Sequence, residues 1–341
     1  AQWRRTPAPA RGDVLRRVGE ILVARKEELA DLMTREMGKP LAETRGDVQE
    51  GIDTAFYAAT EGRRLFGHTV PSELRNKWAM SFRRPIGVAG IITPFNFPLA
   101  IPTWKMFPAL LCGNAVIFKP GEDVPHTGHV LVEILLEAGL PPEVINLVHG
   151  DGAVGAAIVE HPDVALVSFT GSTETGSTVG AICGRTHKRL SLEMGGKNAM
   201  IVMNDADLDL ALDGVLWGAF GTTGQRCTAT SRLILQRGVH DSFIEMLTAR
   251  AATLRLGGAV ARSSAVSFFL GRLPKVGQVD RASRNVSRAS QSEPISFCRS
   301  WPATALRVMG PILPSSATPT RRCSAMAARA GPLFTAQSNT A

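Results

Sequence analysis

The sequence lacks the features of membrane and secreted proteins. None of its apolar runs approaches the length of a membrane-spanning helix, and the N-terminus has no basic segment followed by an apolar one. The first residue is Ala rather than Met, so we expect a fragment of a longer protein. We also expect no membrane partner and a cytoplasmic location.

The cysteines and histidines lack the spacing of disulfide or metal sites. The five cysteines show neither paired spacing nor a C-x-x-C motif, and the seven histidines are scattered. This pattern favours a reducing compartment and predicts no metal site. The cysteines are Cys112, Cys183, Cys227, Cys298 and Cys323.

Acidic residues are almost missing from the C-terminal quarter. Residues 1–258 contain 27 Lys and Arg against 28 Asp and Glu, whereas residues 259–341 contain 11 against 2. A nucleic-acid interaction would depend on this basic tail alone, and the tail has few aromatic residues to stack on bases. We therefore expect no nucleic-acid partner, and an atypical, disordered tail over 258–341.

The rest of the chain has an α/β pattern. Its 341 residues are enough for two domains, and 44% hydrophobic residues are enough for a sizeable core. Apolar residues at helical spacing predict helices over 11–36 and 41–65, and residues 68–85 alternate weakly, as in a hairpin. Strands then alternate with helices, which indicates a mostly parallel sheet with helices on both faces. The predicted strands cover 87–93, 115–119, 144–148 and 164–169, and the helices between them cover 101–111, 124–138 and 154–160.

One cysteine lies in a turn made of small residues. The stretch Phe220-Gly-Thr-Thr-Gly-Gln-Arg-Cys-Thr-Ala-Thr-Ser-Arg232 places Cys227 between an apolar helical run and a β-branched strand. Gly221 and Gly224 allow a tight turn that leaves the sulfur uncrowded, and Arg226 beside it favours the nucleophilic thiolate. A packed or free thiol without a catalytic role is the alternative.

A single carboxylate stands out upstream. In Leu190-Ser-Leu-Glu-Met-Gly-Gly-Lys-Asn198, Glu193 lies between apolar residues and a glycine pair. A carboxylate in apolar surroundings suits a general base that works near neutral pH, and a salt-bridged glutamate at a strand end is the alternative. Together the two stretches resemble the aldehyde dehydrogenase superfamily, whose glutamate motif (LE-hydrophobic-GGK) and cysteine motif (GQxC) occur in this order and about this far apart.

The resemblance runs from about residue 3 to residue 257 and implies a domain organisation. It implies a Rossmann-like NAD(P)-binding domain over 1–67 and 86–194, and the start of a second α/β catalytic domain, incomplete here, over 195–257. Residues 68–85 resemble the family's protruding hairpin, which joins subunits into homo-oligomers; a surface hairpin without a partner is the alternative. The family's later motifs are missing after 258, so we hypothesise that residues 259–341 are translated out of frame.

The resemblance also implies which residues bind NAD or NADP. Ligands of parallel sheets bind at the carboxyl ends of the strands, and three family motifs fall there. One is the turn PWNFP, here with Phe95 in place of Trp; another holds the adenosine ribose; the third is the phosphate turn GSTxxG. Glu122 favours NAD, because a carboxylate repels the 2′-phosphate of NADP. The literal GxGxxG at 150–155 is placed beside the adenine instead. The implied cofactor residues are Thr93, Pro94, Phe95, Lys119, Glu122, Gly152, Gly171, Ser172, Gly176 and Met194.

The implied activity is NAD(P)-dependent oxidation of an aldehyde to a carboxylic acid. Cys227 attacks the aldehyde, the Asn96 amide holds the oxyanion, hydride transfer leaves a thioester, and Glu193 activates the hydrolytic water. The motifs look most like those of α-ketoglutaric semialdehyde dehydrogenases, so we expect a small semialdehyde, with Arg226 and Lys105 as candidate substrate residues. The alternatives are an Arg226 that pairs with a neighbouring chain, a Lys105 on a solvated helix face, and a truncated remnant that only binds nucleotide.

Overall fold

The computed structural model describes residues 2–254, 256–257, 266–267 and 306–309. The chain divides into two compact units. Cys227 belongs to the same unit as Asn96 and Glu193, although the segment Lys197–Phe220 of the other unit separates it from Glu193 in sequence. The first unit contains Ala1–Gly196, Gly221–Cys227 and Leu254–Val279, and the second contains Lys197–Phe220, Thr228–Thr253 and Asp280–Ala341.

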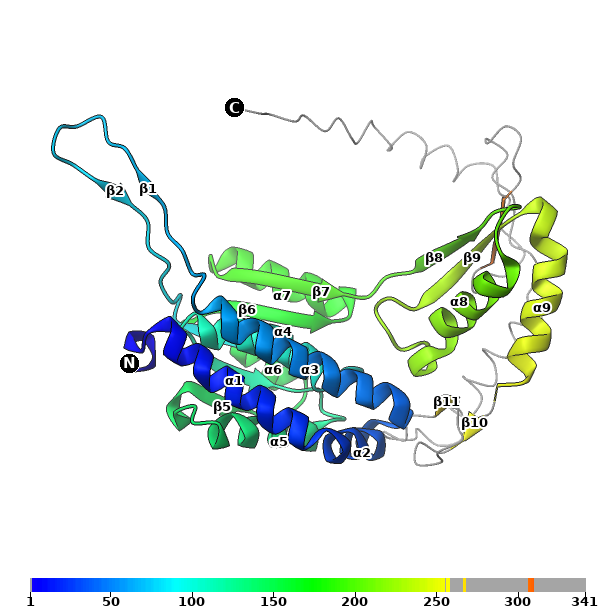
Figure 1. Cartoon of the computed structure of the whole chain (residues 1–341), viewed down its shortest axis with the longest axis horizontal. Helices are drawn as coiled ribbons and strands as arrows, with labels where there is room; N and C mark the ends of the chain where they lie inside the picture. The colour runs from blue at the N-terminus through cyan, green and yellow to red at the C-terminus, as the bar shows by residue number, and fades with distance from the viewer. Residues whose placement is uncertain (1, 255, 258–265, 268–305, 310–341) are drawn as a thin grey trace. The chain divides into compact units, whose positions relative to one another are not determined.

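A five-stranded parallel sheet lies at the centre of the first unit (Figure 1). The strand order is β5-β4-β3-β6-β7, and every neighbouring pair is parallel. The middle strand is an apolar run that is buried almost throughout, as expected when helices cover both faces. The predicted Rossmann-like α/β fold is therefore confirmed. The strands are β3 (Val88–Ile92), β4 (Ala115–Lys119), β5 (Ile145–Leu147), β6 (Val164–Gly171) and β7 (Arg189–Met194).

Two helices, not one, occupy the first predicted helical segment. The helices α1 (Ala8–Ala24) and α2 (Lys26–Met37) are separated at Arg25, whose φ of −102° and ψ of 16° are not helical, so the single helix predicted over 11–36 was wrong there. Gly38 ends α2 in the left-handed conformation, with φ 79°. The next helix, α3 (Leu41–Glu61), follows Pro40. A short 3-10 helix, η1 (Trp3–Arg5), precedes α1.

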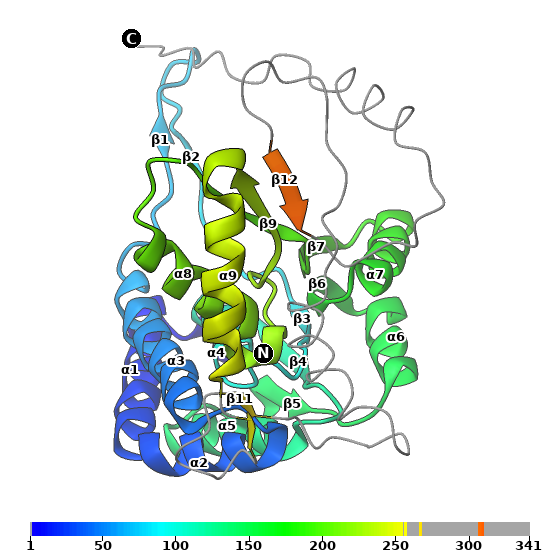
Figure 2. The same ribbon diagram turned by 90° about the vertical axis from the view of Figure 1, so that its right-hand side faces the viewer.

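Helices cover both faces of the sheet (Figure 2). One buried cluster joins α1, α2 and α3 to the sheet through α4 and α5, and it includes Leu22, Phe107 and Phe118. A separate cluster packs α6 and α7 on the other face, and it includes Ile158 and Val179. In the described part of the chain, no helix is long and apolar enough to cross a membrane. The bounds are α4 (Ala100–Leu111), α5 (Pro125–Glu137), η2 (Pro142–Val144), α6 (Gly152–Glu160) and α7 (Thr173–Arg185).

A hairpin connects α3 to the sheet and extends away from it (Figure 1). Its strands β1 (Thr69–Val70) and β2 (Ala79–Met80) pair antiparallel. The side chain of Trp78 is 81% exposed and that of Phe82 is 70% exposed. Large apolar side chains gathered on an exposed segment are typical of a surface that another chain covers.

The second unit has its own sheet of order β12-β9-β8. Strands β8 and β9 are parallel, and β12 is antiparallel to β9. In the first unit, β10 and β11 form a short parallel pair. Both β11 and β12 fall inside the tail that we expected to lack regular structure; the rest of that tail lies outside the described residues. The bounds are β8 (Asn198–Val202), α8 (Leu208–Phe220), β9 (Thr230–Gln236), η4 (Arg237–Val239), α9 (His240–Ala252), β10 (Leu256–Gly257), β11 (Val266–Ser267) and β12 (Leu306–Met309).

Candidate active site

The loop that carries Cys227 has an unusual backbone. It begins with the 3-10 turn η3 (Gly221–Gly224), in which Thr222 and Thr223 have φ angles of 51° and 53°. A β-branched residue rarely adopts this left-handed conformation, so neighbouring groups must stabilise it. Thr222 donates its backbone N–H to Glu43 Oε1 at 3.0 Å and its hydroxyl to Glu43 Oε2. The thiol of Cys227 is exposed at the end of the loop.

The turn after β3 is bound directly to this loop. The Asn96 side chain donates from Nδ2 to the carbonyl oxygen of Gln225 at 2.7 Å, two residues before Cys227. Asn96 Oδ1 is buried and has no hydrogen-bond partner among the residues that the structure describes. A neutral amide donor is therefore held beside the cysteine loop, which is the kind of group that can hydrogen-bond to an oxyanion.

Glu193 lies in β7, near the carboxyl end of the strand, and pairs with Thr170 of β6 in the ladder. Its side chain is exposed, so the expectation of apolar surroundings was wrong. The apolar neighbours in sequence alternate along the strand, and only those that face a helix are shielded from water. An exposed carboxylate at this position has direct access to water.

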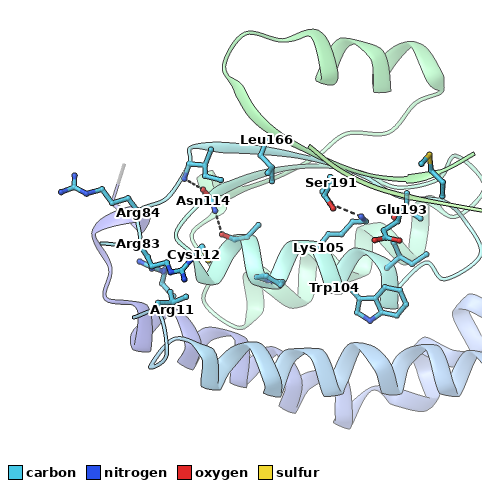
Figure 3. Close-up of a pocket in the computed structure, with 18 of the residues that line it drawn as sticks. Arg11, Arg83, Arg84, Trp104, Lys105, Cys112, Asn114, Leu166, Ser191 and Glu193 are labelled. Atoms are coloured by element: carbon cyan, nitrogen blue, oxygen red, sulfur yellow. Dashed lines mark hydrogen bonds between the residues drawn. The ribbon is translucent and has the colours of Figure 1, made fainter. Parts of the chain in front are cut away.

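Cys227 and Glu193 line one cavity of about 610 Å³ in the first unit. Figure 3 shows Ser191 and Glu193 on the sheet side and Trp104 and Lys105 on the α4 side. The volume is within the usual range of small-molecule sites, about 300–1,000 Å³. The same cavity continues away from Glu193 to Cys112, Asn114 and a group of arginines, Arg11, Arg83 and Arg84.

Lys105 points from α4 towards the sheet. Its Nζ donates to Ser168 Oγ at 3.0 Å and to the carbonyl oxygen of Phe169 at 3.4 Å. Burial lowers the pKa of Lys105 from 10.5 to about 8, although the nearby charge of Glu193 raises it. The alternative of a solvated helix face is therefore wrong for Lys105, whereas Trp104 beside it is exposed.

Two buried threonine hydroxyls lie at the carboxyl edge of the sheet. Thr93 follows β3 and Thr170 is near the end of β6, and neither Oγ1 has a partner within the described ranges. A buried hydroxyl without a hydrogen bond costs about 1–3 kcal/mol. A polar ligand at this edge would remove that cost, so the site fits a nucleotide cofactor.

The predicted ribose-binding residues lie at the end of β4. Lys119 is buried, its Nζ donates to the carbonyl oxygen of Pro120 at 3.2 Å, and Glu122 is exposed. Burial lowers the pKa of Lys119, and the charges of Glu122 and Asp151 partly raise it again. A Cβ at Gly121 would lie 3.0 Å from the backbone nitrogen of Phe95, so this glycine lets the turn at Pro94–Phe95 approach closely.

The predicted phosphate turn begins α7. Ser172 caps the helix by accepting from the backbone N–H of Thr175 at 3.1 Å. Gly176 lies where any Cβ would overlap the sulfur of Met194, so the first turn of α7 packs directly on the residue after Glu193. A Cβ at Gly171 would likewise overlap the ring of Phe169. Backbone N–H groups at such a helix start suit an anion.

The GxGxxG stretch at 150–155 starts α6 differently. Its cap is Asp151, whose carboxylate accepts from the backbone N–H of Ala153 at 2.9 Å. This negative charge at the helix N-terminus disfavours a pyrophosphate there. A Cβ at Gly152 would meet open space, so this glycine is not required by packing.

Arg226 packs back on the start of its own loop. A Cβ at Gly221 would lie 2.6 Å from the Arg226 guanidinium, and Arg226 is not among the described residues that line the cavity. Over the ranges that the structure describes, no group of three or more His, Cys, Asp or Glu side chains is arranged to hold a metal ion.

The sequence patterns did not single out the start of α3, which contacts both parts of this site. Glu43 binds the cysteine loop, and Lys39 Nζ donates to the carbonyl oxygen of Asn96 at 3.0 Å. In sequence, these residues are ordinary features of a helix start. Their contacts join segments 57 and 179 residues apart, and no local signal predicts them.

Comparison with known proteins gives a consistent result. The model of the "Aldehyde dehydrogenase family" matches residues 1–293, which extends beyond the limit near residue 257 that the motifs suggested. An "Alpha-ketoglutaric semialdehyde dehydrogenase" of Bacillus subtilis is 40% identical over 85% of this chain. An Escherichia coli "NADP dependent enzyme" is 38% identical over 78% of this chain and 55% of its own, with a TM-score of 0.75. A Staphylococcus aureus betaine aldehyde dehydrogenase, solved with NAD+, is 34% identical over 77% of this chain and 53% of its own, with a TM-score of 0.76. The chain covers 59% of the length of the Bacillus relative.

Proposed function

The chain belongs to the aldehyde dehydrogenase family, and we propose that it oxidises an aldehyde to a carboxylic acid with NAD or NADP, through a thioester on Cys227. One observation carries this proposal. Cys227 and Glu193 line the same cavity, and the Asn96 side-chain amide donates a hydrogen bond to the loop that carries the cysteine. A nucleophile, a carboxylate and an oxyanion donor in one place are the groups that this chemistry needs.

Each of these groups has a separate task. The Cys227 thiolate attacks the aldehyde carbon, and the developing oxyanion accepts from Asn96 Nδ2 and the Cys227 backbone N–H. Loss of one such donor typically lowers the rate about 10²–10³-fold. The nicotinamide cofactor, when bound, supplies the hydride acceptor. Glu193 takes the proton of the water that hydrolyses the thioester, a role that its exposure to solvent supports.

The cofactor residues proposed here follow the carboxyl edge of the sheet. Lys119 and Glu122 would bind the adenosine ribose, and the Ser172 turn would bind the pyrophosphate. The buried hydroxyls of Thr93 and Thr170, which have no hydrogen-bond partner in the described part of the chain, support a polar ligand along this edge. Glu122 favours NAD through charge repulsion of a 2′-phosphate.

We assign the substrate to the small semialdehydes that carry a carboxylate. The name of the Bacillus relative supports this class. Lys105 supports it physically, because its ammonium lines the cavity that Cys227 and Glu193 share and can pair with the substrate carboxylate. Arg226, the other candidate, has its guanidinium against Gly221.

Rapid mixing tests the proposal. Purified protein is mixed with NAD and succinic semialdehyde, and NADH is followed by absorbance for the wild type, Cys227→Ala and Cys112→Ala. The matched control is informative because Cys112 lines the far end of the same cavity and burial raises the pKa of its thiol. We expect NADH from the wild type and from Cys112→Ala, and none from Cys227→Ala. NADH formation that survives in Cys227→Ala, or NAD binding without any NADH in the wild type, would contradict the proposal.

A further inference from the structure

The start of α3 lies against both halves of the proposed oxyanion site. Glu43 is in the first turn of α3, and Lys39 is in the loop just before it. We propose that Lys39 and Glu43 are positioning residues, which hold the Asn96 turn and the Cys227 loop in register. This inference rests on the function proposed above, because it concerns the two oxyanion donors, but its physical basis is a set of hydrogen bonds made by Lys39 and Glu43 themselves.

Lys39 fixes the backbone of the Asn96 turn. Its side chain is 1% exposed, and its Nζ donates to the carbonyl oxygen of Asn96 at 3.0 Å and to Asp47 Oδ2 at 3.2 Å. The ammonium also lies 3.5 Å from the centre of the Phe97 ring. A charge buried this deeply requires its partners, so the lysine, the carboxylate and the turn form one rigid group.

Asp47 extends this group to the next helix. Its second oxygen, Oδ1, accepts from the backbone N–H of Ala100, the first residue of α4, at 2.7 Å. Burial raises the pKa of Asp47, whereas the Lys39 ammonium and the Ala100 N–H lower it. The buried ion pair between Asp47 of α3 and Lys39 just before it therefore holds the turn between β3 and α4.

Glu43 fixes the cysteine loop. Both of its oxygens accept hydrogen bonds from Thr222, one from the backbone N–H and one from the hydroxyl. Thr222 has a positive φ, and such a threonine keeps this conformation only where its surroundings impose it. The position of Glu43 near the helix N-terminus stabilises its negative charge.

The hydrogen bond from Asn96 Nδ2 to the Gln225 carbonyl oxygen connects the Asn96 turn to the cysteine loop and so completes a ring of three contacts. In this ring, α3 holds the Asn96 turn through Lys39 and the cysteine loop through Glu43. A shift of either anchor moves the Asn96 amide relative to the Cys227 N–H. Oxyanion donors act only within about 2.7–3.1 Å of the oxygen, so a small shift lowers the rate of the chemical step more than substrate binding.

The test compares variants of the full chain. Glu43→Gln and Thr222→Val weaken the contact between Glu43 and the cysteine loop. Thr222→Ser keeps the hydroxyl and is the conservative variant. The double variant Lys39→Met/Asp47→Asn removes the contact between Lys39 and the Asn96 turn without leaving a buried charge. The matched control is Glu27→Gln, because Glu27 forms an exposed ion pair with Arg45 that ties α2 to α3 only. Three experiments are made on each variant: steady-state kinetics for kcat and KM, hydrogen exchange of the peptide 221–227, and the rate of iodoacetamide alkylation of Cys227 by peptide-resolved mass spectrometry.

We expect both anchor losses to lower kcat about 10–100-fold with little change in KM. We expect faster hydrogen exchange at 221–227 and an altered alkylation rate at Cys227 but not at Cys112, while Thr222→Ser and Glu27→Gln resemble the wild type. A folded Glu43→Gln or Thr222→Val with wild-type kcat, exchange and alkylation overturns the inference. If the wild-type chain makes no NADH, the proposed function fails, and exchange and alkylation alone still decide whether α3 positions the loop. If Glu43→Gln does not fold, the comparison of the isosteric Thr222→Val with Thr222→Ser tests the inference instead.

Discussion

Lys105 combines partial burial with a neighbouring carboxylate, and its pKa of about 8 lies within the range of ordinary assays. Helical spacing alone favoured a solvated face for this residue. The difference arises because the Lys105 side chain reaches Ser168 and Phe169 of β6. These residues lie 63 and 64 positions away in sequence, and no local pattern encodes that contact. The outcome for Glu193 has the same origin, since its apolar neighbours in sequence do not enclose it.

The charge of Lys105 leads to a prediction about pH. The protonated ammonium pairs with the carboxylate of a semialdehyde below pH 8, and it becomes neutral as the pH rises through about 8. We expect KM for succinic semialdehyde to rise between pH 7 and 9, while KM for an uncharged aldehyde of equal length stays nearly constant. Lys105→Met should remove this difference. Parallel KM profiles for the two aldehydes in the wild type would show that Lys105 does not bind the carboxylate.

The same shift has a consequence for folding. The pKa of Lys105 in the folded protein is below the ordinary value of 10.5, so the folded protein loses this proton at a lower pH than the unfolded chain. Over that interval the unfolded chain binds more protons, and the stability contributed by this group therefore rises with pH. Urea unfolding of the wild type and Lys105→Met between pH 7 and 10 should converge as the pH rises. A constant difference would contradict the lowered pKa.

At the scale of elements, strand β7 was not among the predicted strands, because Arg189, Ser191 and Glu193 interrupt its apolar residues. The other strands of the parallel sheet were predictable because each is a short apolar run between helices. The break at Arg25 was not, since the apolar spacing continues through it from α1 to α2. The motif residues of the phosphate turn were recognised from sequence, but the packing of Gly176 on Met194 depends on how α7 lies along β7. The hydrogen bond from Asn96 to Gln225 joins residues that are 129 positions apart, so it could not be predicted from the sequence either.

The start of α7 gives a prediction with a built-in control. Gly176→Ala places a Cβ 2.4 Å from the Met194 sulfur, so the first turn of α7 or the Met194 side chain must shift, whereas a Cβ at Gly184, in the last turn, meets open space. We expect Gly176→Ala to weaken NAD binding about tenfold, a loss of about 1.4 kcal/mol. We expect Gly184→Ala to bind normally and to be stabilised by about 0.5–1 kcal/mol. Fluorescence titration with NAD and thermal unfolding measure both. Equal affinities for the two variants would contradict the role given to this turn.

At the scale of the whole molecule, the family match covers residues 1–293, although the chain covers only 59% of the Bacillus relative. The short family signatures end near residue 257, whereas the similarity to the family continues to residue 293. The exposed Trp78 and Phe82 of the hairpin are the strongest indication of a further partner, and we infer that it is a second copy of the chain.

Sedimentation tests this inference about the hairpin. We expect the wild type to self-associate, and the double variant Trp78→Glu/Phe82→Glu to sediment as a monomer because charges disfavour burial of the hairpin. Tyr57→Glu is the control, since Tyr57 is an exposed aromatic residue that belongs to α3 and not to the hairpin. If the wild type sediments as a monomer at both the assay concentration and millimolar concentrations of the protein, the hairpin does not mediate self-association.

The most direct test of the account is detection of the thioester itself. In Glu193→Gln, hydrolysis of the intermediate is impaired, so succinic semialdehyde and NAD should leave an acyl group on a cysteine. Digestion and mass spectrometry then locate it. We expect the adduct on the peptide that contains Cys227, formed together with one NADH per modified chain. An adduct on Cys112, or NADH formation without any adduct in Glu193→Gln, would contradict it.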